Sequence, residues 1–222
     1  ERKLVEFDFP VYVDSPLAIE ATSIFNKNFQ SCFDEEAMAL IQSGISPIRF
    51  PNLHLAISSD ESKAINFDST PKVIISASGM CEAGRIKHHL KHNLWRPECT
   101  VLFVGYQAYG TLGRALTEGA EYVKLFGETI EVKAELAQLD GVSGHADKNG
   151  LLHWVEAFSP KPQMVFVVHG EDETCDHFAE CLTDEHQIPA CAPFSGALFD
   201  LATGEWIKEG LKIPVAAEKP AA

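Results

Sequence analysis

The sequence predicts an α/β fold built on a doubly wound, mostly parallel sheet, and two observations support this prediction. Short, uninterrupted apolar runs rich in β-branched residues recur along the chain, which is typical of strands buried on both faces. Helical stretches lie between these runs, and strands that alternate with helices form parallel sheets. With 222 residues, of which 45% are hydrophobic, the chain is long enough for one large core or two modest ones.

The predicted elements follow one another in a simple order. The expected strands are 11–13, 53–57, 73–76, 101–104 and 164–168, and the expected helices are 18–29, 34–43, 84–94, 147–158 and 172–185. The neighbourhood of Pro47, Pro51 and Pro71 predicts loop apart from strand 53–57. Two β-rich arms, 122–126 and 129–136, flank Gly127-Glu128 as in a hairpin. We place a domain boundary there, so the expected domains are 9–129 and 130–208, followed by a flexible tail over 209–222.

The composition limits the classes of function. The net charge of −14 argues against broad adhesion to nucleic acid, since phosphate binding relies on Lys and Arg, so any such site has to be local. The six cysteines are scattered without a Cys-x-x-Cys pair, as expected for reduced thiols. No run approaches the roughly 18 to 20 apolar residues of a membrane span and the start has no signal-peptide layout, so we expect a cytoplasmic protein without a membrane partner. The start without Met and the small-residue end indicate a piece of a longer protein.

The first candidate site is the turn between the strand at 73–76 and the helix that Gly84-Arg85 opens. Ser78, Gly79 and Met80 form this turn. Free backbone N–H groups and the helix dipole converge at such a place and favour a phosphate. A tight turn that needs glycine only for backbone freedom explains the same residues, and the spacing alone favours it. No Gly-Lys-Ser/Thr follows, so this is not a Walker loop.

The helix beyond that turn has a basic stripe. At about 100° per residue its basic side chains fall on one face: Arg85, His88, His89, His92 and Arg96. A local basic cluster in an acidic chain is a candidate for following a nucleic-acid backbone. An ordinary solvated face, with His88 or His89 packed under the sheet, is the alternative, and the charge run alone does not decide between them.

A third group follows the strand at 101–104. Functional side chains gather at the C-terminal ends of strands in open α/β sheets. Tyr106 and Gln107 stand at that position, and Arg114 follows Gly110-Thr-Leu-Gly113. A tyrosine there can stack on a base while the arginine meets a phosphate, although structural roles explain both residues as well.

Two histidines stand in unusual settings. His145 lies in a polar turn before a helix that Asp147 can cap, and His169 stands where the strand at 164–168 ends. Neutral imidazole is a common metal ligand and the usual general acid or base near neutral pH. A catalytic zinc needs roughly three protein ligands, yet the sequence has no His-x-His pair and no His-Glu-x-x-His motif. Because Gly-x-Ser-x-Gly is absent, Ser143 near His145 does not indicate a serine hydrolase.

Seven motifs in order resemble the β-CASP metallo-β-lactamase ribonucleases, in particular the bacterial and archaeal relatives of the endonuclease that cleaves pre-mRNA before polyadenylation. The motifs are Val11-Tyr-Val-Asp-Ser-Pro-Leu-Ala18, Ser76-Ala-Ser-Gly-Met80, Gly84-Arg-Ile-Lys-His-His-Leu90, Phe103-Val-Gly-Tyr-Gln107, Gly110-Thr-Leu-Gly-Arg114, Gly144-His-Ala-Asp147 and Val168-His-Gly-Glu171. The resemblance runs from about Phe9 to Trp206. It makes 9–129 a β-CASP domain and 130–208 the RNA-specificity segment that completes a metallo-β-lactamase αββα fold, whose N-terminal core this chain lacks.

The resemblance also assigns roles. His145 matches the histidine that acts as general acid or stabilises the scissile phosphate, and His169 matches a zinc ligand. The predicted RNA contacts are Ser78, Gly79, Met80, Arg85, His88, Tyr106, Gln107, Arg114 and Ser143. The family holds two zinc ions and cleaves single-stranded RNA, but its main ligand motif lies upstream, so we expect this chain alone to be inactive. A homodimer through the unpaired C-terminal segment stays open.

Two other readings stay open. A non-catalytic RNA-binding or partner-docking α/β module would bind RNA in the presence of chelators. A nucleotide-binding enzyme that uses the Ser78-Gly79 turn would bind mononucleotides and give His169 no role. We rank the second last, because the sequence shows no base or ribose pocket.

Overall fold

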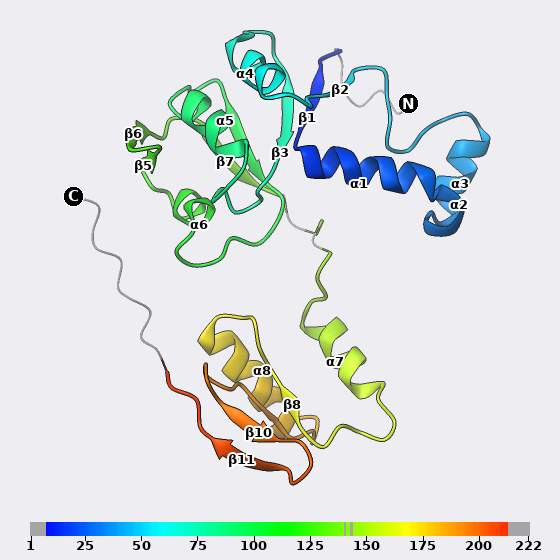
Figure 1. Cartoon of the computed structure of the whole chain (residues 1–222), viewed down its shortest axis with the longest axis vertical. Coiled ribbons are helices and arrows are strands. Elements are labelled where there is room, and N and C mark those ends of the chain that lie inside the picture. The colour runs from blue at the N-terminus through cyan, green and yellow to red at the C-terminus, as the bar shows by residue number, and fades with distance from the viewer. Residues whose placement is uncertain (1–7, 140, 143, 213–222) are drawn as a thin grey trace. The chain divides into compact units, whose positions relative to one another are not determined.

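The computed structural model describes residues 8–139, 141–142 and 144–212 (Figure 1). The chain forms two compact units, residues 1–143 and 144–222, which we call the first and the second unit. Both combine helices with short strands, so the predicted α/β class is confirmed. In the part of the chain described, no helix is both long and apolar enough to cross a bilayer.

The first unit contains a three-stranded parallel sheet. Strand β1 (Val11–Asp14) lies between β2 (Leu53–Leu55) and β3 (Val73–Ser76). Val11 is in register with Leu53 on one side and Val73 on the other. A second parallel pair joins β4 (Thr100–Phe103) to β7 (Glu135–Gln138). Most of the described strand pairs are parallel, as predicted, but they form several short sheets instead of one continuous doubly wound sheet.

The hairpin prediction was right for the turn and wrong for the second arm. Strands β5 (Tyr122–Leu125) and β6 (Glu128–Glu131) pair antiparallel around Phe126 and Gly127, which both have positive φ. The chain then leaves the hairpin, because the N–H groups of Lys133 and Ala134 both donate to the Leu94 carbonyl. Strand β7 therefore pairs with β4, and the first unit extends past the boundary expected near Gly127.

Most of the helices described in the first unit begin at a residue whose side chain caps the helix. Its helices are α1 (Pro16–Lys27), α2 (Phe29–Cys32), α3 (Glu35–Gln42), α4 (Ser59–Phe67), α5 (Ile86–Asn93) and α6 (Leu112–Thr117). Ser15 caps α1, Asp34 caps α3 and Thr111 caps α6, each with a side-chain oxygen that accepts a backbone N–H. Helix α4 stands where only loop was expected, and Ser58 and Glu61 form its capping box.

A core of leucines holds α5, α6 and the hairpin together. Leu94, Leu116 and Leu125 have no exposed surface, and Phe103 of β4 packs with them. Burial of each such side chain stabilises the fold by about 1.5 to 3 kcal/mol. This core fixes the position of α5 and of the loops at the ends of β3 and β4, which carry most of the predicted site residues.

The second unit is smaller. It contains α7 (Lys148–Glu156), β8 (Val165–Phe166), α8 (Asp172–Asp184), β9 (Ala190–Cys191), β10 (Leu198–Asp200) and β11 (Glu205–Lys208). Strands β8 and β9 are parallel, whereas β10 and β11 form an antiparallel pair that was not predicted. Leu152 and Val155 of α7 pack against Cys181 and Leu182 of α8 in its core.

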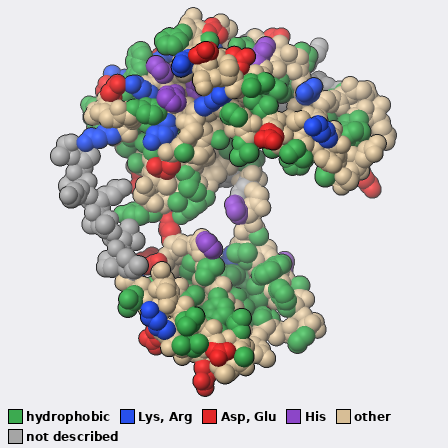
Figure 2. All heavy atoms as spheres, viewed as in Figure 1, with side chains coloured by type: hydrophobic (Ala, Val, Ile, Leu, Met, Phe, Trp, Pro, Cys, Tyr) green, Lys and Arg blue, Asp and Glu red, His purple; other side chains and the backbone are tan. Residues whose placement is uncertain are grey.

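The second unit also exposes large apolar side chains. Trp154 and Phe158 are 63% and 46% exposed, and Val168 is 55% exposed. On the side of this unit that Figure 2 presents, hydrophobic side chains cover much of the surface. Such patches mark surfaces that other protein segments cover.

Candidate functional site

The turn after β3 is closed by its own backbone. Ser78 N–H donates to the Ala83 carbonyl, and the Ser78 hydroxyl accepts from Ala83 N–H at 3.2 Å. Gly84 has a φ of +80°, and a Cβ at this position would lie 2.4 Å from the Ala77 carbonyl oxygen. Only glycine fits there. The structural need for glycine is therefore met at Gly84, while Gly79 has open space around its Cα.

Gln107 ties this turn to the end of β4. Its side chain is buried, and Nε2 donates to the carbonyls of Gly79 and Gly105, both at 3.0 Å. Gly113 N–H donates to the Met80 carbonyl at 3.0 Å, and a Cβ on Gly113 would lie 1.7 Å from Gln107 Oε1. We call these four residues, Gly79, Met80, Gln107 and Gly113, the turn clamp. It brings together the two motifs that were predicted separately after β3 and β4.

Exposed side chains surround the turn clamp. Met80 is 37% exposed and Tyr106 is 58% exposed. Arg114, in the first turn of α6, is one-third exposed. Its Nε donates to Glu118 Oε1 at 2.6 Å and one NH group reaches the Gln107 carbonyl at 3.4 Å. An aromatic ring, a thioether and a guanidinium thus stand beside a rigid backbone turn.

The basic stripe of α5 is divided between the interior and the surface. Arg85 donates to Asp14 Oδ1 at 2.6 Å and to the carbonyls of Ala56 and Ile57, both at 2.8 Å. His89 is buried, so packing under the sheet, the alternative stated for it, is confirmed. These bonds occupy Arg85 with protein acceptors, and its contact with RNA stays a prediction.

A buried carboxylate organises the inner part of the stripe. Asp14 has no exposed surface and lies 2.6 Å from His89 Nε2 and 2.5 Å from the Ser62 hydroxyl. Burial alone would raise the pKa of Asp14, but hydrogen bonds from Ser62, Arg85 and His89 hold it below its ordinary value. Burial lowers the pKa of His89, against the opposing effect of Asp14. Sequence analysis missed Asp14, although an acidic residue that ends an apolar strand was a signal.

The outer part of the basic stripe is His88, which packs on Phe126. His88 is exposed, and its ring stacks on Phe126 with centroids 4.6 Å apart and planes 24° apart. Lys87 Nζ lies 5.7 Å from the centroid of the same Phe126 ring. The predicted contact at His88 therefore belongs to a small aromatic and cationic surface between α5 and the hairpin.

The two predicted catalytic histidines both lie in the second unit. His145 is exposed in the bend before α7, and Asp147 caps that helix as predicted by accepting Gly150 N–H at 2.8 Å. His169 is exposed, with a φ of +68°, in the loop between β8 and α8. It lines a cavity of about 120 Å³ together with Asp172, Cys175 and Asp176. Ser143 lies outside the described residues.

His169 does not complete a metal site from the described residues. Among the residues with determined placement, the group of three donors within reach of one ion is Cys181, Glu185 and His186, which excludes His169. His169 is chemically suited to zinc, but a catalytic zinc site needs about three protein ligands. His169 therefore fits the role of one ligand in such a site.

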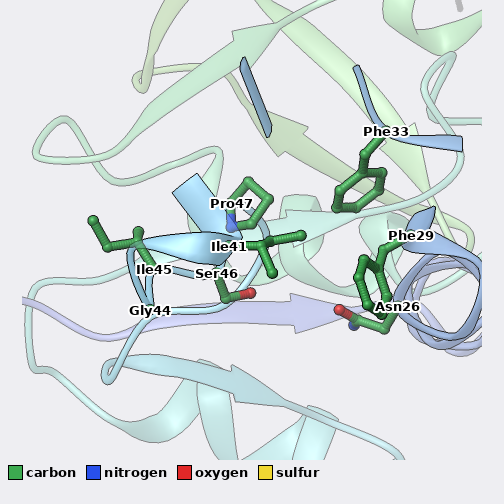
Figure 3. A pocket seen from close by; sticks show the side chains of 8 residues that line it. All are labelled: Asn26, Phe29, Phe33, Ile41, Gly44, Ile45, Ser46 and Pro47. Atoms are coloured by element: carbon green, nitrogen blue, oxygen red, sulfur yellow. The ribbon is translucent and has the colours of Figure 1, made fainter. Parts of the chain in front are cut away.

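A further cavity lies away from all predicted residues. It has a volume of about 310 Å³ and is lined by side chains from α1, α2, α3 and the loop after them (Figure 3). Phe29, Phe33 and Ile41 make it largely apolar, and Asn26 Nδ2 is buried without a hydrogen-bond partner there. None of the predicted site residues lines this cavity.

Two family models match successive parts of the chain. A family model described as "Beta-Casp domain" matches residues 1–116, and one described as "Zn-dependent metallo-hydrolase RNA specificity domain" matches residues 129–193. The second match begins near the boundary expected at Gly127, whereas the first compact unit continues to residue 143.

Several relatives are about one-third identical to this chain over the aligned residues. "Ribonuclease TTHA0252" of Thermus thermophilus is 38% identical over 74% of this chain and 37% of its own length. "Transcription termination factor FttA" of Pyrococcus abyssi is 31% identical over 84% of this chain and 29% of its own. "RNase J-like protein" of Methanocaldococcus jannaschii is 31% identical over 87% of this chain and 43% of its own.

The chain thus spans between 29% and 43% of the length of these three relatives. The β-CASP model covers more than half of the chain, and the relatives cover about three quarters of it or more. The resemblance drawn from the seven motifs is confirmed, and the chain belongs to the β-CASP metallo-β-lactamase family of ribonucleases.

Proposed function

We propose that this chain is the RNA-binding part of a zinc-dependent ribonuclease that hydrolyses phosphodiester bonds in single-stranded RNA. The observation that carries this proposal is the turn clamp. Gln107 and Gly113 hold the Gly79–Met80 backbone rigidly beside exposed Tyr106 and partly exposed Arg114. Single strands bind where aromatic rings accept bases and fixed polar groups accept phosphates. The net charge of −14 argues against broad adhesion to RNA, so affinity has to come from a local surface such as this one.

In this proposal the second unit supplies the groups for cleavage. His145 precedes the capped start of α7 and is exposed, so its imidazole can donate a proton to a leaving oxygen or stabilise the scissile phosphate. His169 supplies one ligand to zinc, which activates water for attack on phosphorus when bound. The other ligands of the two ions that the family resemblance implies come from outside the described residues. The chain by itself is therefore expected not to cleave RNA.

A second candidate function is a non-catalytic RNA-binding or partner-docking module. It is favoured because, among the described residues, His169 belongs to no group of three side chains that could hold one metal ion. The two functions differ in the effect of a chelator, because a module that only binds RNA needs no metal.

The decisive experiment uses the full-length parent protein with zinc and a labelled single-stranded RNA. His145→Ala is expected to abolish cleavage with unchanged metal content, and His169→Ala to abolish cleavage with reduced metal content. His177→Ala, which changes another exposed histidine of the second unit, is the matched control. Full cleavage by either of the first two variants contradicts the assigned roles. If the unaltered parent binds RNA without cutting it, the module is the better description.

A further inference from the structure

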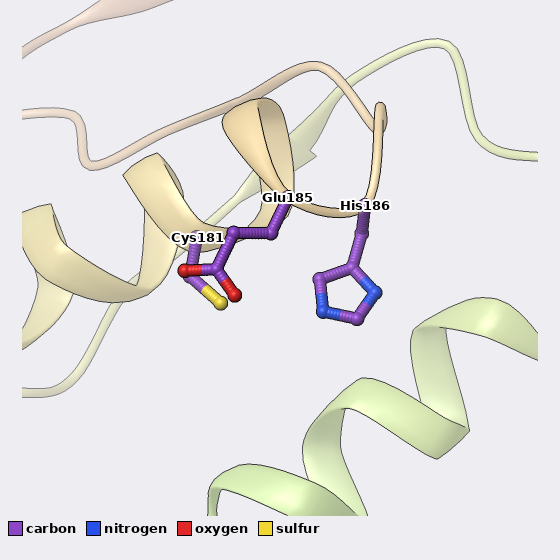
Figure 4. A group of neighbouring side chains, drawn as sticks. All are labelled: Cys181, Glu185 and His186. Carbon is purple, nitrogen blue, oxygen red and sulfur yellow. The ribbon is translucent and has the colours of Figure 1, made fainter.

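A cluster of three metal-binding side chains lies at the C-terminal end of α8, and none of the predicted site residues belongs to it. Cys181, Glu185 and His186 each offer one donor atom, and these atoms lie within 4.8 Å of one another (Figure 4). Cys181 is a free, buried thiol, whereas Glu185 is exposed. His169 precedes the other end of this 13-residue helix, about 20 Å away along its axis.

The backbone fixes the three residues in one helical turn. Glu185 and His186 both donate their N–H groups to the Cys181 carbonyl, at 3.1 and 3.3 Å. Cys181 itself packs in the core of the second unit beside Leu182. The thiol therefore has a fixed position, and the two other donors lie at the helix end, where the partial negative charge of the helix dipole favours a cation.

A second carboxylate orients the imidazole. His186 Nδ1 lies 2.6 Å from Glu156 Oε1 at the end of α7. When Nδ1 donates to this carboxylate, the lone pair of a neutral imidazole is on Nε2. Figure 4 shows that this other ring nitrogen is on the side of Cys181 and Glu185. A histidine ligand held by a carboxylate through its second nitrogen is the usual arrangement in protein metal sites.

The charges of the cluster call for a cation. Glu156, Glu185 and the helix end are negative, and Lys161 Nζ bonds the His186 carbonyl at 3.4 Å and not the side chains of the cluster. Thiol, imidazole and carboxylate together form a donor set that zinc binds well.

We propose that Cys181, Glu185 and His186 bind one zinc ion, separate from the catalytic ions of the proposed nuclease. The thiol loses its proton to solvent on binding, and water takes the fourth position. Because Glu156 holds His186 from α7, the ion fastens the end of α8 to the end of α7. The ion holds the two helix ends together, and it binds with or without RNA.

The test is a titration of the purified chain with Co²⁺, which replaces zinc and reports its ligands. One equivalent is expected to give visible bands of tetrahedral cobalt and a near-ultraviolet thiolate charge-transfer band, and zinc is expected to abolish both. Cys181→Ser should remove the charge-transfer band, while Cys191→Ser, a cysteine of the same unit, should keep it. Glu156→Gln should weaken binding about 10- to 100-fold by loss of the carboxylate that orients His186.

Further variants separate loss of the site from misfolding and from any contribution of His169. Because Cys181 is buried, His186→Gln provides a variant outside the core, and His177→Gln on the same helix is its matched control. His169→Ala should leave all the bands unchanged. Loss of binding in His186→Gln with native circular dichroism supports the site. Cobalt bands that survive Cys181→Ser and His186→Gln, or no binding by the unaltered chain at millimolar Co²⁺, overturn it.

Discussion

His89 Nε2 lies 2.6 Å from Asp14 Oδ2, and both side chains are buried in the first unit. Asp14 ends β1, and His89 lies in the middle of α5. Ser62 on α4 and Arg85 before α5 bond the same carboxylate. One charge thus joins a strand and two helices, so its removal affects all three.

Substitution of Asp14 should destabilise the chain strongly. In Asp14→Asn, Arg85 and His89 lose a buried charged acceptor, which typically costs about 3 to 5 kcal/mol. Urea denaturation measures the free energy of unfolding. The control is Asp60→Asn, whose carboxylate is 94% exposed and pairs only with exposed Lys63, and it should change stability by less than about 0.5 kcal/mol. Equal stability of the two variants would show that the network contributes nothing.

Acid should weaken the first unit in two steps. The pKa of His89 lies below its ordinary value of 6.5, so the unfolded chain takes up that proton first and stability falls as the pH drops through this range. The pKa of Asp14 is also lowered, so its contribution is present above the ordinary value of 3.8 and is lost as the pH falls further, through the folded value.

Urea midpoints at a series of pH values check this dependence. His89→Gln should flatten the first step, whereas His88→Gln, at an exposed neighbour, should not. A midpoint that stays constant from neutral pH down to the ordinary pKa of aspartate contradicts the lowered pKa of His89.

A methyl group at Gly113 should open the turn clamp. In Gly113→Ala the new Cβ displaces the Gln107 side chain, which loses its bonds to Gly79 and Gly105. We expect destabilisation by about 1 to 3 kcal/mol and weaker RNA binding. Gly105→Ala is the matched control, because nothing lies within 4 Å of a Cβ there. If fluorescence anisotropy gives both variants the same RNA affinity, the clamp does not present the RNA site.

Tyr106 should contribute to RNA affinity by stacking. Tyr106→Ala is expected to cost about 1 to 3 kcal/mol in binding of single-stranded RNA, the range for one stacked base. Tyr122→Ala is the control, since that ring is 59% exposed on β5 and belongs to none of the predicted sites. Equal loss in both variants would point to a general effect on the first unit.

The sequence predicted the elements that apolar runs or helix caps define locally. The apolar strands at 11–13, 73–76 and 101–104 and the helices that Asp34 and Asp147 cap all appear in the structure. Helix α4 was missed because three nearby prolines outweighed the Ser58–Glu61 capping box. Strand β7 was assigned to the hairpin, since its partner β4 lies 35 residues earlier in the chain and no local pattern shows that pairing.

For the site residues too, the sequence showed local position, whereas contacts with distant residues appeared only in the structure. The sequence placed Gln107 at a strand end, but only the structure shows that it is buried and bonds Gly79, 28 residues away. The stripe on α5 was visible from its spacing, whereas the separation of Arg85 and His89 from His88 depends on Asp14, which lies on another element. Spacing identifies which residues share a face, and tertiary partners decide which of them meet solvent.

The spread of the Asp14 partners along the chain has a consequence for biosynthesis. Ser62, Arg85 and His89 follow Asp14 by 48, 71 and 75 residues. As the chain emerges from a ribosome, β1 appears long before any of the side chains that bond the Asp14 carboxylate when it is buried. An unpaired buried charge is too costly to form, so the sheet around β1 closes only after α5 has emerged, and a nascent chain that stops at α4 is expected to stay open to proteases.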